Sequence, residues 1–174
     1  MPEARPERIV LVGFMGAGKS TVGRVLARRL GWSFLDMDER IEERTGRRIA
    51  DFFRERGEAA FRSEELRVAQ ELRFRSRQVI ATGGGAFAEP ATREALREGA
   101  FTVYVAGDFE TLAARVPADG SRPLAADREI MRRLLAEREP YYRSADLTVD
   151  GTEAPEAVAG RIVAAVFPER DAER

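Results

Sequence analysis

A glycine-rich segment near the N-terminus has the residue types and spacing that bind the phosphates of a nucleotide. Residues 13–20 read Gly-Phe-Met-Gly-Ala-Gly-Lys-Ser, which fits the pattern G-x-x-x-x-G-K-[ST], and a threonine follows at 21. Glycines let the backbone curl so that its N–H groups point at phosphate oxygens. In this pattern the lysine reaches the β- and γ-phosphates and the serine hydroxyl binds Mg²⁺. The residues expected to bind a nucleoside triphosphate are therefore Gly16, Ala17, Gly18, Lys19, Ser20 and Thr21, with Ser20 as the metal ligand.

Lys19 is the only lysine of the chain, whose other 28 basic residues are all arginines. A strong compositional bias of this kind, typical of a GC-rich genome, has replaced lysine everywhere else. We infer that position 19 needs a compact ammonium on a flexible stem and cannot use a planar guanidinium. This supports a catalytic role for Lys19 but does not distinguish ATP from GTP, or a kinase from a motor or switch ATPase.

Two further groups of residues follow predicted strands and are expected to lie at the same edge of the sheet. Asp36 and Asp38 come directly after one short apolar run, and three glycines, 83–85, follow another. Ligands of open parallel sheets bind at the carboxyl ends of the strands. One carboxylate can orient the attacking hydroxyl or accept its proton, and the other can bind neighbouring hydroxyls. Three consecutive glycines are expected where a ligand approaches the main chain.

The arginines are harder to rank. Arg122 lies in a polar segment with proline and glycine, about 116–126, which we expect to form a mobile lid. An arginine on a closing lid can meet the transferred phosphoryl group. Spacing alone does not single out Arg62 or Arg138, because a single arginine among 28 is usually a solvated surface residue.

The composition excludes several classes of chemistry. The chain of 174 residues has no cysteine and no histidine, which excludes disulfides, thiolate or histidine metal sites and histidine-based triads. A guanine-reading N-K-x-D motif is also excluded, because there is no asparagine and no second lysine. The net charge of −1 gives no reason to expect nucleic acid or an anionic membrane as partner. Without a long apolar run or a signal-like start, a soluble cytoplasmic protein is expected.

Short apolar runs alternate with helical patterns along the whole chain. Strands are expected at 9–12, 33–35, 79–81, 101–105 and 147–149. Helices are expected at 18–30, 38–44 with Asp38 as cap, 49–74 with a break at Gly57, 90–97, 109–115, 127–142 and 154–166. This alternation predicts an α/β protein of one domain, 1–174, with a parallel sheet between helices on both faces.

Taken together, the motifs resemble those of the shikimate kinase family over about 9–166, nearly the whole chain. The residues that carry the resemblance are 13–21, 35–38, 41–42, 45–46, 49–53, 57–58, 61–62, 65, 82–86, 122–124 and 138–142. The resemblance implies a P-loop kinase with a three-layer α/β/α sandwich and a five-stranded parallel sheet in the order 2-3-1-4-5. It also implies phosphorylation of the 3-hydroxyl of shikimate by ATP with Mg²⁺, on the route to chorismate and the aromatic amino acids.

The same resemblance assigns roles to residues. It implies that Asp38 binds the hydroxyls of shikimate, that Arg62 and Arg138 bind its carboxylate, and that Gly84 adds a backbone contact. It implies further that Asp36 lies near the reacting hydroxyl and the metal, that Glu65 orients Arg62, and that Phe53 and Phe61 wall the ring. Arg122 becomes the lid arginine that faces ATP, the substrate-binding segment spans about 36–74, and the family expectation is a monomer.

The sequence departs from the family pattern in a few places. Met37 replaces a threonine between the two aspartates, Ala125 replaces a leucine in the lid, and the stretch before Arg138 is short. No basic residue precedes the last helix, so no adenine contact is assigned there. A related kinase acting on gluconate or a nucleoside monophosphate, and a non-catalytic nucleotide-binding regulator, remain as alternatives. Equal ADP release without any acceptor, or a preference for gluconate, would favour them.

Overall fold

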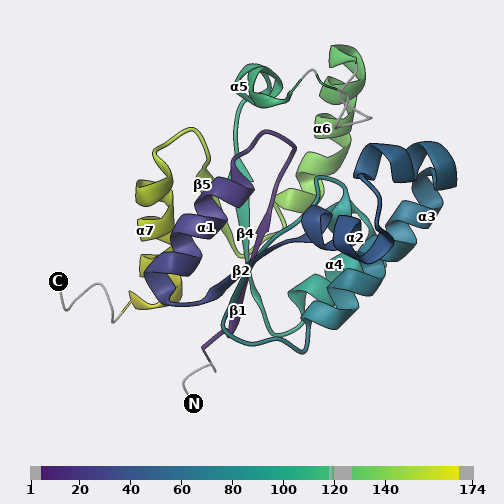
Figure 1. Cartoon of the computed structure of the whole chain (residues 1–174). Coiled ribbons are helices and arrows are strands. Elements are labelled where there is room, and N and C mark those ends of the chain that lie inside the picture. The colour runs from purple at the N-terminus through teal and green to yellow at the C-terminus, as the bar shows by residue number, and fades with distance from the viewer. Residues whose placement is uncertain (1–4, 118, 120–126, 169–174) are drawn as a thin grey trace.

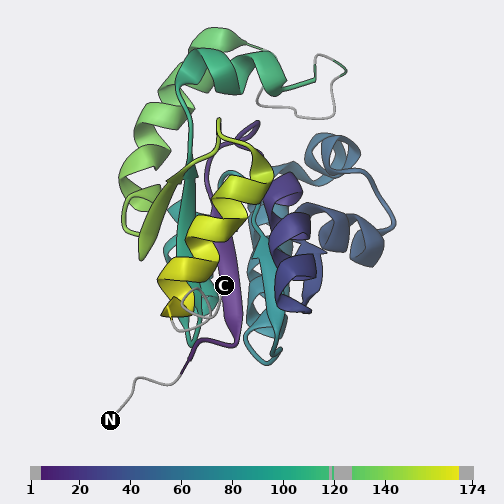
Figure 2. The same ribbon diagram turned by 90° about the vertical axis from the view of Figure 1, so that its left-hand side faces the viewer.

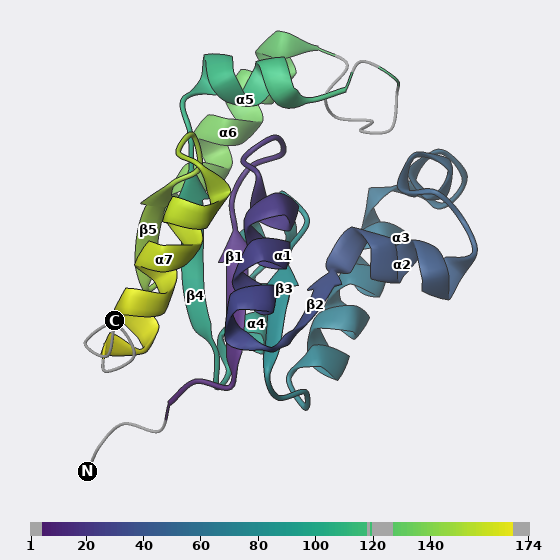
Figure 3. The same ribbon diagram turned by 60° about the vertical axis from the view of Figure 1, so that its left-hand side comes forward.

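The fold is that of a computed structural model, which describes residues 5–117, 119 and 127–168. Its centre is a sheet of five short strands: β1 (Arg8–Val12), β2 (Ser33–Asp36), β3 (Gln78–Ala81), β4 (Phe101–Ala106) and β5 (Leu147–Asp150). Every strand pair is parallel, and the order is β2-β3-β1-β4-β5 (Figure 3). The expected strand order and fold class are therefore confirmed. β1 and β3 are buried along their whole length, as central parallel strands are when helices cover both faces.

One face of the sheet is covered by α1 (Lys19–Leu30) and α7 (Pro155–Val166), which pack side by side (Figures 1 and 2). α1 buries Val22, Leu26 and Leu30 at helical spacing. Gly23 lies on the same buried stripe, where an added Cβ would overlap the ring of Phe34. This glycine therefore allows α1 to approach β2 closely.

The other face carries α3 (Ile49–Leu72), α4 (Pro90–Arg97) and α6 (Arg128–Tyr142), with a short 3₁₀ turn, η1 (Ala86–Ala88), between them. The short α5 (Phe109–Arg115) follows β4 and lies with one end of α6 beyond the carboxyl edge of the sheet (Figure 3). Asp127 caps α6 by accepting from the backbone N–H groups of Glu129 and Ile130. No helix within the described ranges is long and apolar enough to cross a membrane.

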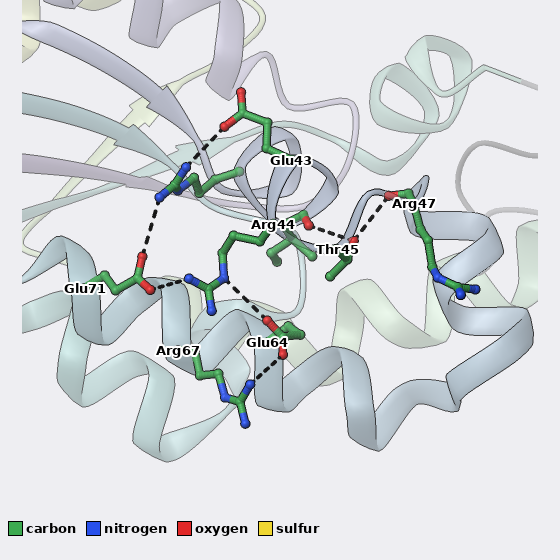
Figure 4. A network of polar contacts seen from close by, with 9 residues as sticks. Glu43, Arg44, Thr45, Arg47, Glu64, Arg67 and Glu71 are labelled. Atoms are coloured by element: carbon green, nitrogen blue, oxygen red, sulfur yellow. Dashed lines mark hydrogen bonds and ion pairs between the residues drawn. The ribbon is translucent and has the colours of Figure 1, made fainter.

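The segment after β2 forms α2 (Met37–Thr45), which stands beside the sheet next to β2, and then leads into α3 (Figure 3). α3 is interrupted at Gly57, where φ is 81° and ψ is 174°, so the predicted break is confirmed. Its second half is tied to α2 by a network of ion pairs, seen in Figure 4. Arg44 pairs with Glu71 and lies 3.5 Å from Glu64, which also accepts from Arg67 at 3.0 Å. Exposed pairs are individually weak, but a network of several fixes the relative position of the two helices.

Candidate active site

The glycine-rich loop leaves β1 and runs directly into α1. Gly16 and Gly18 have positive φ angles of 79° and 90°, in the left-handed region that glycine adopts at little cost. A Cβ atom on Gly16 would lie 2.5 Å from the carbonyl oxygen of Leu112, so that position has no room for a side chain. The loop is therefore held in a curled shape against α5. Its last residue, Gly18, precedes the N-terminus of α1, where unpaired N–H groups favour an anion.

Lys19 is only 8% exposed, and its side chain folds back over the loop. The ammonium Nζ donates to the carbonyl oxygen of Gly13 at 2.7 Å and to that of Phe14 at 2.8 Å. Both acceptors belong to the loop that the pattern assigns to phosphates. The single lysine of the chain therefore lies in the curled loop and not in bulk solvent.

Asp36 connects the first turn of α1 with the start of α2. Its Oδ2 accepts from the Ser20 hydroxyl at 2.5 Å, and its Oδ1 accepts from the backbone N–H of Asp38 at 2.9 Å and of Glu39 at 3.3 Å. Asp36 is thus the N-cap of α2. The prediction that Asp38 caps this helix is wrong, because β2 ends at Asp36 and the helix starts with the very next residue.

These residues line a first cavity at the carboxyl edge of the sheet, which we call the P-loop cavity. Its lining comprises Met15, Gly16, Gly18, Lys19, Ser20, Thr21, Asp36, Asp38, Thr82, Gly83 and Gly84. Of the predicted nucleotide-binding residues in the loop, Ala17 alone is not part of this lining, and it is buried. Polar oxygen and nitrogen atoms from three segments of the chain, which follow β1, β2 and β3 or end them, therefore surround one space.

A second cavity, which we call the arginine cavity, adjoins the first and has a volume of about 450 Å³ including its open mouth. Its lining comprises Met15, Asp38, Ile49, Phe53, Phe61, Arg62, Glu65, Gly83, Gly84, Gly85 and Arg138. All four predicted substrate-binding residues, Asp38, Arg62, Gly84 and Arg138, are in this set. Four residues line both cavities, so a ligand in one would face a ligand in the other.

The two guanidinium groups lie against the glycine turn that follows β3. A Cβ atom on Gly85 would be 2.5 Å from Nη1 of Arg62, and one on Gly84 would be 3.5 Å from Nη1 of Arg138. Tyr142 holds this turn by donating its hydroxyl to the carbonyl oxygen of Gly84. Gly85 therefore makes room for the guanidinium of Arg62, and Gly83 makes room for the carboxylates of Asp38 and Glu65, whereas a Cβ atom on Gly84 would be at ordinary contact distance.

Glu65 and Arg62 form a buried ion pair on one face of α3. Nη1 of Arg62 donates to Oε1 of Glu65 at 2.8 Å, and Nη2 donates to the exposed Glu58 at 3.3 Å. Burial raises the pKa of Glu65 to about 7, although the positive charge of Arg62 opposes the shift. Burial also works to lower the pKa of Arg62, but the two carboxylates outweigh it and the net shift is upward. Arg62 is therefore a cation at any physiological pH, whereas Glu65 titrates near neutrality.

The remaining wall of the arginine cavity is apolar. Phe53 and Phe61, from the two halves of α3, stack with their ring centroids 4.6 Å apart. Ile49 and Met15 complete the lining. A ligand for this cavity therefore combines an anionic group, hydroxyls and a small apolar body.

Sequence reasoning did not single out some residues of the two cavities. Met15, inside the loop pattern, lines both of them, and Ile49 lines the arginine cavity. Arg115 lines neither cavity but lies beside the loop, since its Nη1 would be 3.9 Å from a Cβ atom on Gly18, and it donates to the carbonyl oxygen of Gly151 at 3.1 Å. A position inside the loop was the available signal for Met15, but nothing in the spacing marks Arg115. Arg122 and most of the predicted lid, residues 118 and 120–126, lie outside the described residues.

A parallel sheet in this order, with a glycine-rich loop after its central strand and a polar cavity beside that loop, defines a P-loop kinase with a small acceptor. Comparisons with known proteins agree. The family model "Shikimate kinase" matches residues 15–167. Shikimate kinase of Paramagnetospirillum magneticum is 44% identical over 170 residues, spanning 95% of this chain and 87% of the relative. That of Moorella thermoacetica is 46% identical over 156 residues, spanning 88% of this chain and 90% of the relative.

Solved structures give the same result. Shikimate kinase from Acinetobacter baumannii, in complex with shikimate, superposes with a TM-score of 0.90 at 39% identity and covers 96% of both chains. A gluconokinase from Sinorhizobium meliloti reaches a TM-score of 0.55 at 23% identity, which shows a shared fold alone. The chain belongs to the shikimate kinase family and is therefore a kinase that phosphorylates shikimate in the shikimate pathway, with ATP as the phosphoryl donor.

Proposed function

We propose that the chain transfers the γ-phosphoryl group of ATP to the 3-hydroxyl of shikimate, giving shikimate 3-phosphate and ADP. The observation that carries the proposal is the contact between the two cavities, which share Met15, Asp38, Gly83 and Gly84. A ring acid in the arginine cavity would present its hydroxyls to a triphosphate in the P-loop cavity. Phosphoryl transfer depends mainly on positioning and on charge neutralisation, and this arrangement supplies both.

The arginine cavity has the groups that the acceptor needs. The carboxylate of shikimate would bind between Arg62 and Arg138, since guanidinium groups form strong charge-assisted hydrogen bonds with carboxylates. Asp38 would accept from the ring hydroxyls on the side of the P-loop cavity. Phe53 and Phe61 would pack against the ring carbons. Gly84 would contribute a backbone contact.

The P-loop cavity would hold the donor. The curled backbone and the ammonium of Lys19 would neutralise the β- and γ-phosphates as charge shifts during transfer. The ammonium would exchange its bonds to the Gly13 and Phe14 carbonyls for phosphate oxygens. Arg122, whose role follows from the family resemblance, would approach the same phosphates from the lid and exclude water.

The oxygen ligands in the P-loop cavity also fit Mg²⁺. The hydroxyl of Ser20 and the carboxylate of Asp36, 2.5 Å apart, are hard oxygen ligands of the kind this ion prefers. Among the described residues no three acidic, histidine or cysteine side chains cluster to hold a metal. Following the loop pattern and the family resemblance, Ser20 would bind the ion directly and Asp36 through water. When bound, Mg²⁺ supplies neutralisation of the charge on the β- and γ-phosphates. Asp36 would also orient the reacting hydroxyl.

A coupled assay for ADP release tests the acceptor. Shikimate, gluconate and AMP are offered in parallel at equal concentration, together with a reaction without acceptor. We expect turnover with shikimate alone, and phosphorus NMR of the product to place the phosphate on the 3-oxygen. Equal ADP release without acceptor, or faster turnover of gluconate, would contradict the proposal. We also propose a monomer that acts in the cytoplasm, and light scattering after gel filtration measures the first of these two properties.

A further inference from the structure

Glu65 is an unusual group for a cavity that binds an acid. It is fully buried on α3 and lines the same cavity as Arg62 and Arg138. Its Oε1 accepts from Arg62, whereas its Oε2 is buried and has no hydrogen-bond partner anywhere in the part of the chain that the structure describes. A buried, unpartnered carboxylate oxygen is costly when it is charged. Protonation would remove this cost and turn the oxygen into a donor.

Charged groups face Glu65 from three helices. Arg62 comes from α3 itself, Asp38 from α2 and Arg138 from α6. Oδ1 of Asp38 and Oε2 of Glu65 flank one glycine, since a Cβ atom on Gly83 would lie 2.8 Å from the first and 3.1 Å from the second. Glu58 and Glu89 face Arg62 from outside, at 3.3 Å and 4.0 Å. Before an acid binds, the two arginines therefore balance the negative charges of Asp38 and Glu65.

A bound carboxylate changes this balance. When an acid binds to Arg62 and Arg138, one more negative charge enters a buried space in which the cations already have acidic partners. Glu65 then loses part of the attraction that kept it ionised and gains repulsion from the ligand. Because the pKa of Glu65 is already raised to about 7 without ligand, a further rise makes the protonated form of Glu65 favourable at and just above neutral pH.

We propose that Glu65 takes up one proton from solution as the carboxylate of the acceptor binds to Arg62 and Arg138. The acid and the proton then bind with positive coupling, and each raises the affinity for the other. Glu65 is in this sense a positioning residue, which keeps Arg62 in place and adjusts the charge of the cavity to its ligand. The inference rests on the proposed function, since it needs shikimate to bind with its carboxylate on these arginines.

Titration calorimetry of shikimate into the full-length enzyme tests the proposal. The observed enthalpy is measured in buffers with different ionisation enthalpies at several pH values from 5.5 to 9, and its slope against buffer enthalpy gives the protons taken up. We expect uptake of roughly half a proton or more per shikimate between pH 7 and 8, falling toward zero at either end of the range. The affinity for shikimate should weaken above pH 7, because the required proton becomes scarce.

The composition of the chain leaves few other groups that could contribute to the measured proton uptake. The chain has no histidine and no cysteine, so the α-amino group is the other group that ordinarily titrates in this range. Glu65→Gln keeps the shape and the acceptor for Arg62 but cannot take up the proton, and its slope should be near zero. Glu58→Gln is the matched control, because Glu58 pairs with the same guanidinium from the exposed side. It should leave the proton uptake intact.

The outcomes are distinguishable. Binding of shikimate by the wild-type enzyme with no proton uptake between pH 6 and 8.5 would overturn this inference and leave the proposed function standing. Unchanged uptake in a folded Glu65→Gln variant would overturn the assignment to Glu65. An enzyme that neither binds nor phosphorylates shikimate would overturn the proposed function and this inference with it. The wild-type measurement is decisive even if the variant fails to fold.

Discussion

Replacing Gly85 with alanine adds one methyl group at the point where the glycine turn meets the acceptor cavity. The backbone at Gly85 has φ −95° and ψ −10°, which alanine adopts without strain. The new Cβ would lie 2.5 Å from Nη1 and 2.6 Å from Cζ of Arg62. Non-bonded carbon contacts are normally about 3.5 Å or longer, so the guanidinium must retreat by about 1 Å. The bond of 2.8 Å from Nη1 to Glu65 does not survive this shift.

The displacement of Arg62 lowers the affinity for the acceptor. Arg62 would then meet the carboxylate of shikimate out of position and lose a hydrogen bond between charged groups. Such a bond contributes about 1.5–3 kcal/mol, and about 1.4 kcal/mol corresponds to a factor of ten. We therefore expect the KM for shikimate to rise between about 10-fold and 140-fold. The KM for ATP should hardly change, because the P-loop cavity does not include Gly85.

Steady-state kinetics with each substrate varied in turn measures both constants. Gly160→Ala is a matched control, because its Cβ also meets the end of an arginine, Arg29, at 3.1 Å, but on the opposite side of the sheet in α7. It should leave both KM values unchanged. If Gly85→Ala changed the KM for shikimate by less than twofold, Arg62 would not hold the acceptor where the cavity places it. A rise in the KM for ATP alone would indicate that the glycine turn binds ATP and not shikimate.

Three other perturbations test different parts of the site. Lys19→Arg should lower kcat on the order of 100-fold, because a planar guanidinium does not fit where the ammonium lies between two loop carbonyls; near-normal turnover would contradict this. Arg138→Ala should raise the KM for shikimate by about 30-fold or more, as truncation of a buried charge pair does, and an effect on ATP alone would refute its assignment. In the folded chain the pKa of Glu65 is about 7, above its ordinary value of about 4.3. The folded state therefore binds more protons than the unfolded chain between these values. The stability that Glu65 contributes is present at low pH and lost as the pH rises to 7, by about 3 kcal/mol relative to Glu65→Gln. Denaturant unfolding of both proteins at pH 5 and pH 8 measures this difference, and parallel behaviour of the two would count against the buried titration.

Much of the architecture follows from local patterns in the sequence. The short apolar runs predict all five strands to within a residue or two, and Gly57 marks the break in α3 because its backbone angles suit glycine alone. The order of the strands in the sheet, in contrast, cannot be predicted from these local patterns. Alternation of strands and helices does not specify which strands are neighbours, and that expectation came from the family resemblance. The sequence does not decide the cap of α2, because Asp36 and Asp38 are equally good capping residues. In the structure Asp36 has the extended backbone of a cap and accepts from the N–H groups of Asp38 and Glu39.

The residues of the site also fall into two groups, those that can be predicted from the sequence and those that only the fold identifies. The nucleotide loop is contiguous in sequence, so its chemistry can be predicted from spacing. Arg62 and Arg138 are far apart in the chain, and only the fold brings them to one glycine turn. Burial does not distinguish them either. Arg8 is also buried, but it donates to the backbone carbonyls of Leu72 and Glu98, and burial lowers its pKa. A buried arginine with carbonyl partners supports the fold, whereas one that lines a cavity can bind a ligand.

The distribution of the two cavities along the chain has a consequence for synthesis on the ribosome. The loop and ammonium for the donor are complete by residue 20, while Arg138 and Tyr142 emerge more than a hundred residues later. Between them the ribosome must deliver β3, the glycine turn and β4. A growing polypeptide therefore carries the phosphate loop long before it can recognise an acid. The residues that bind the acceptor are therefore completed much later in synthesis than the residues of the phosphate loop.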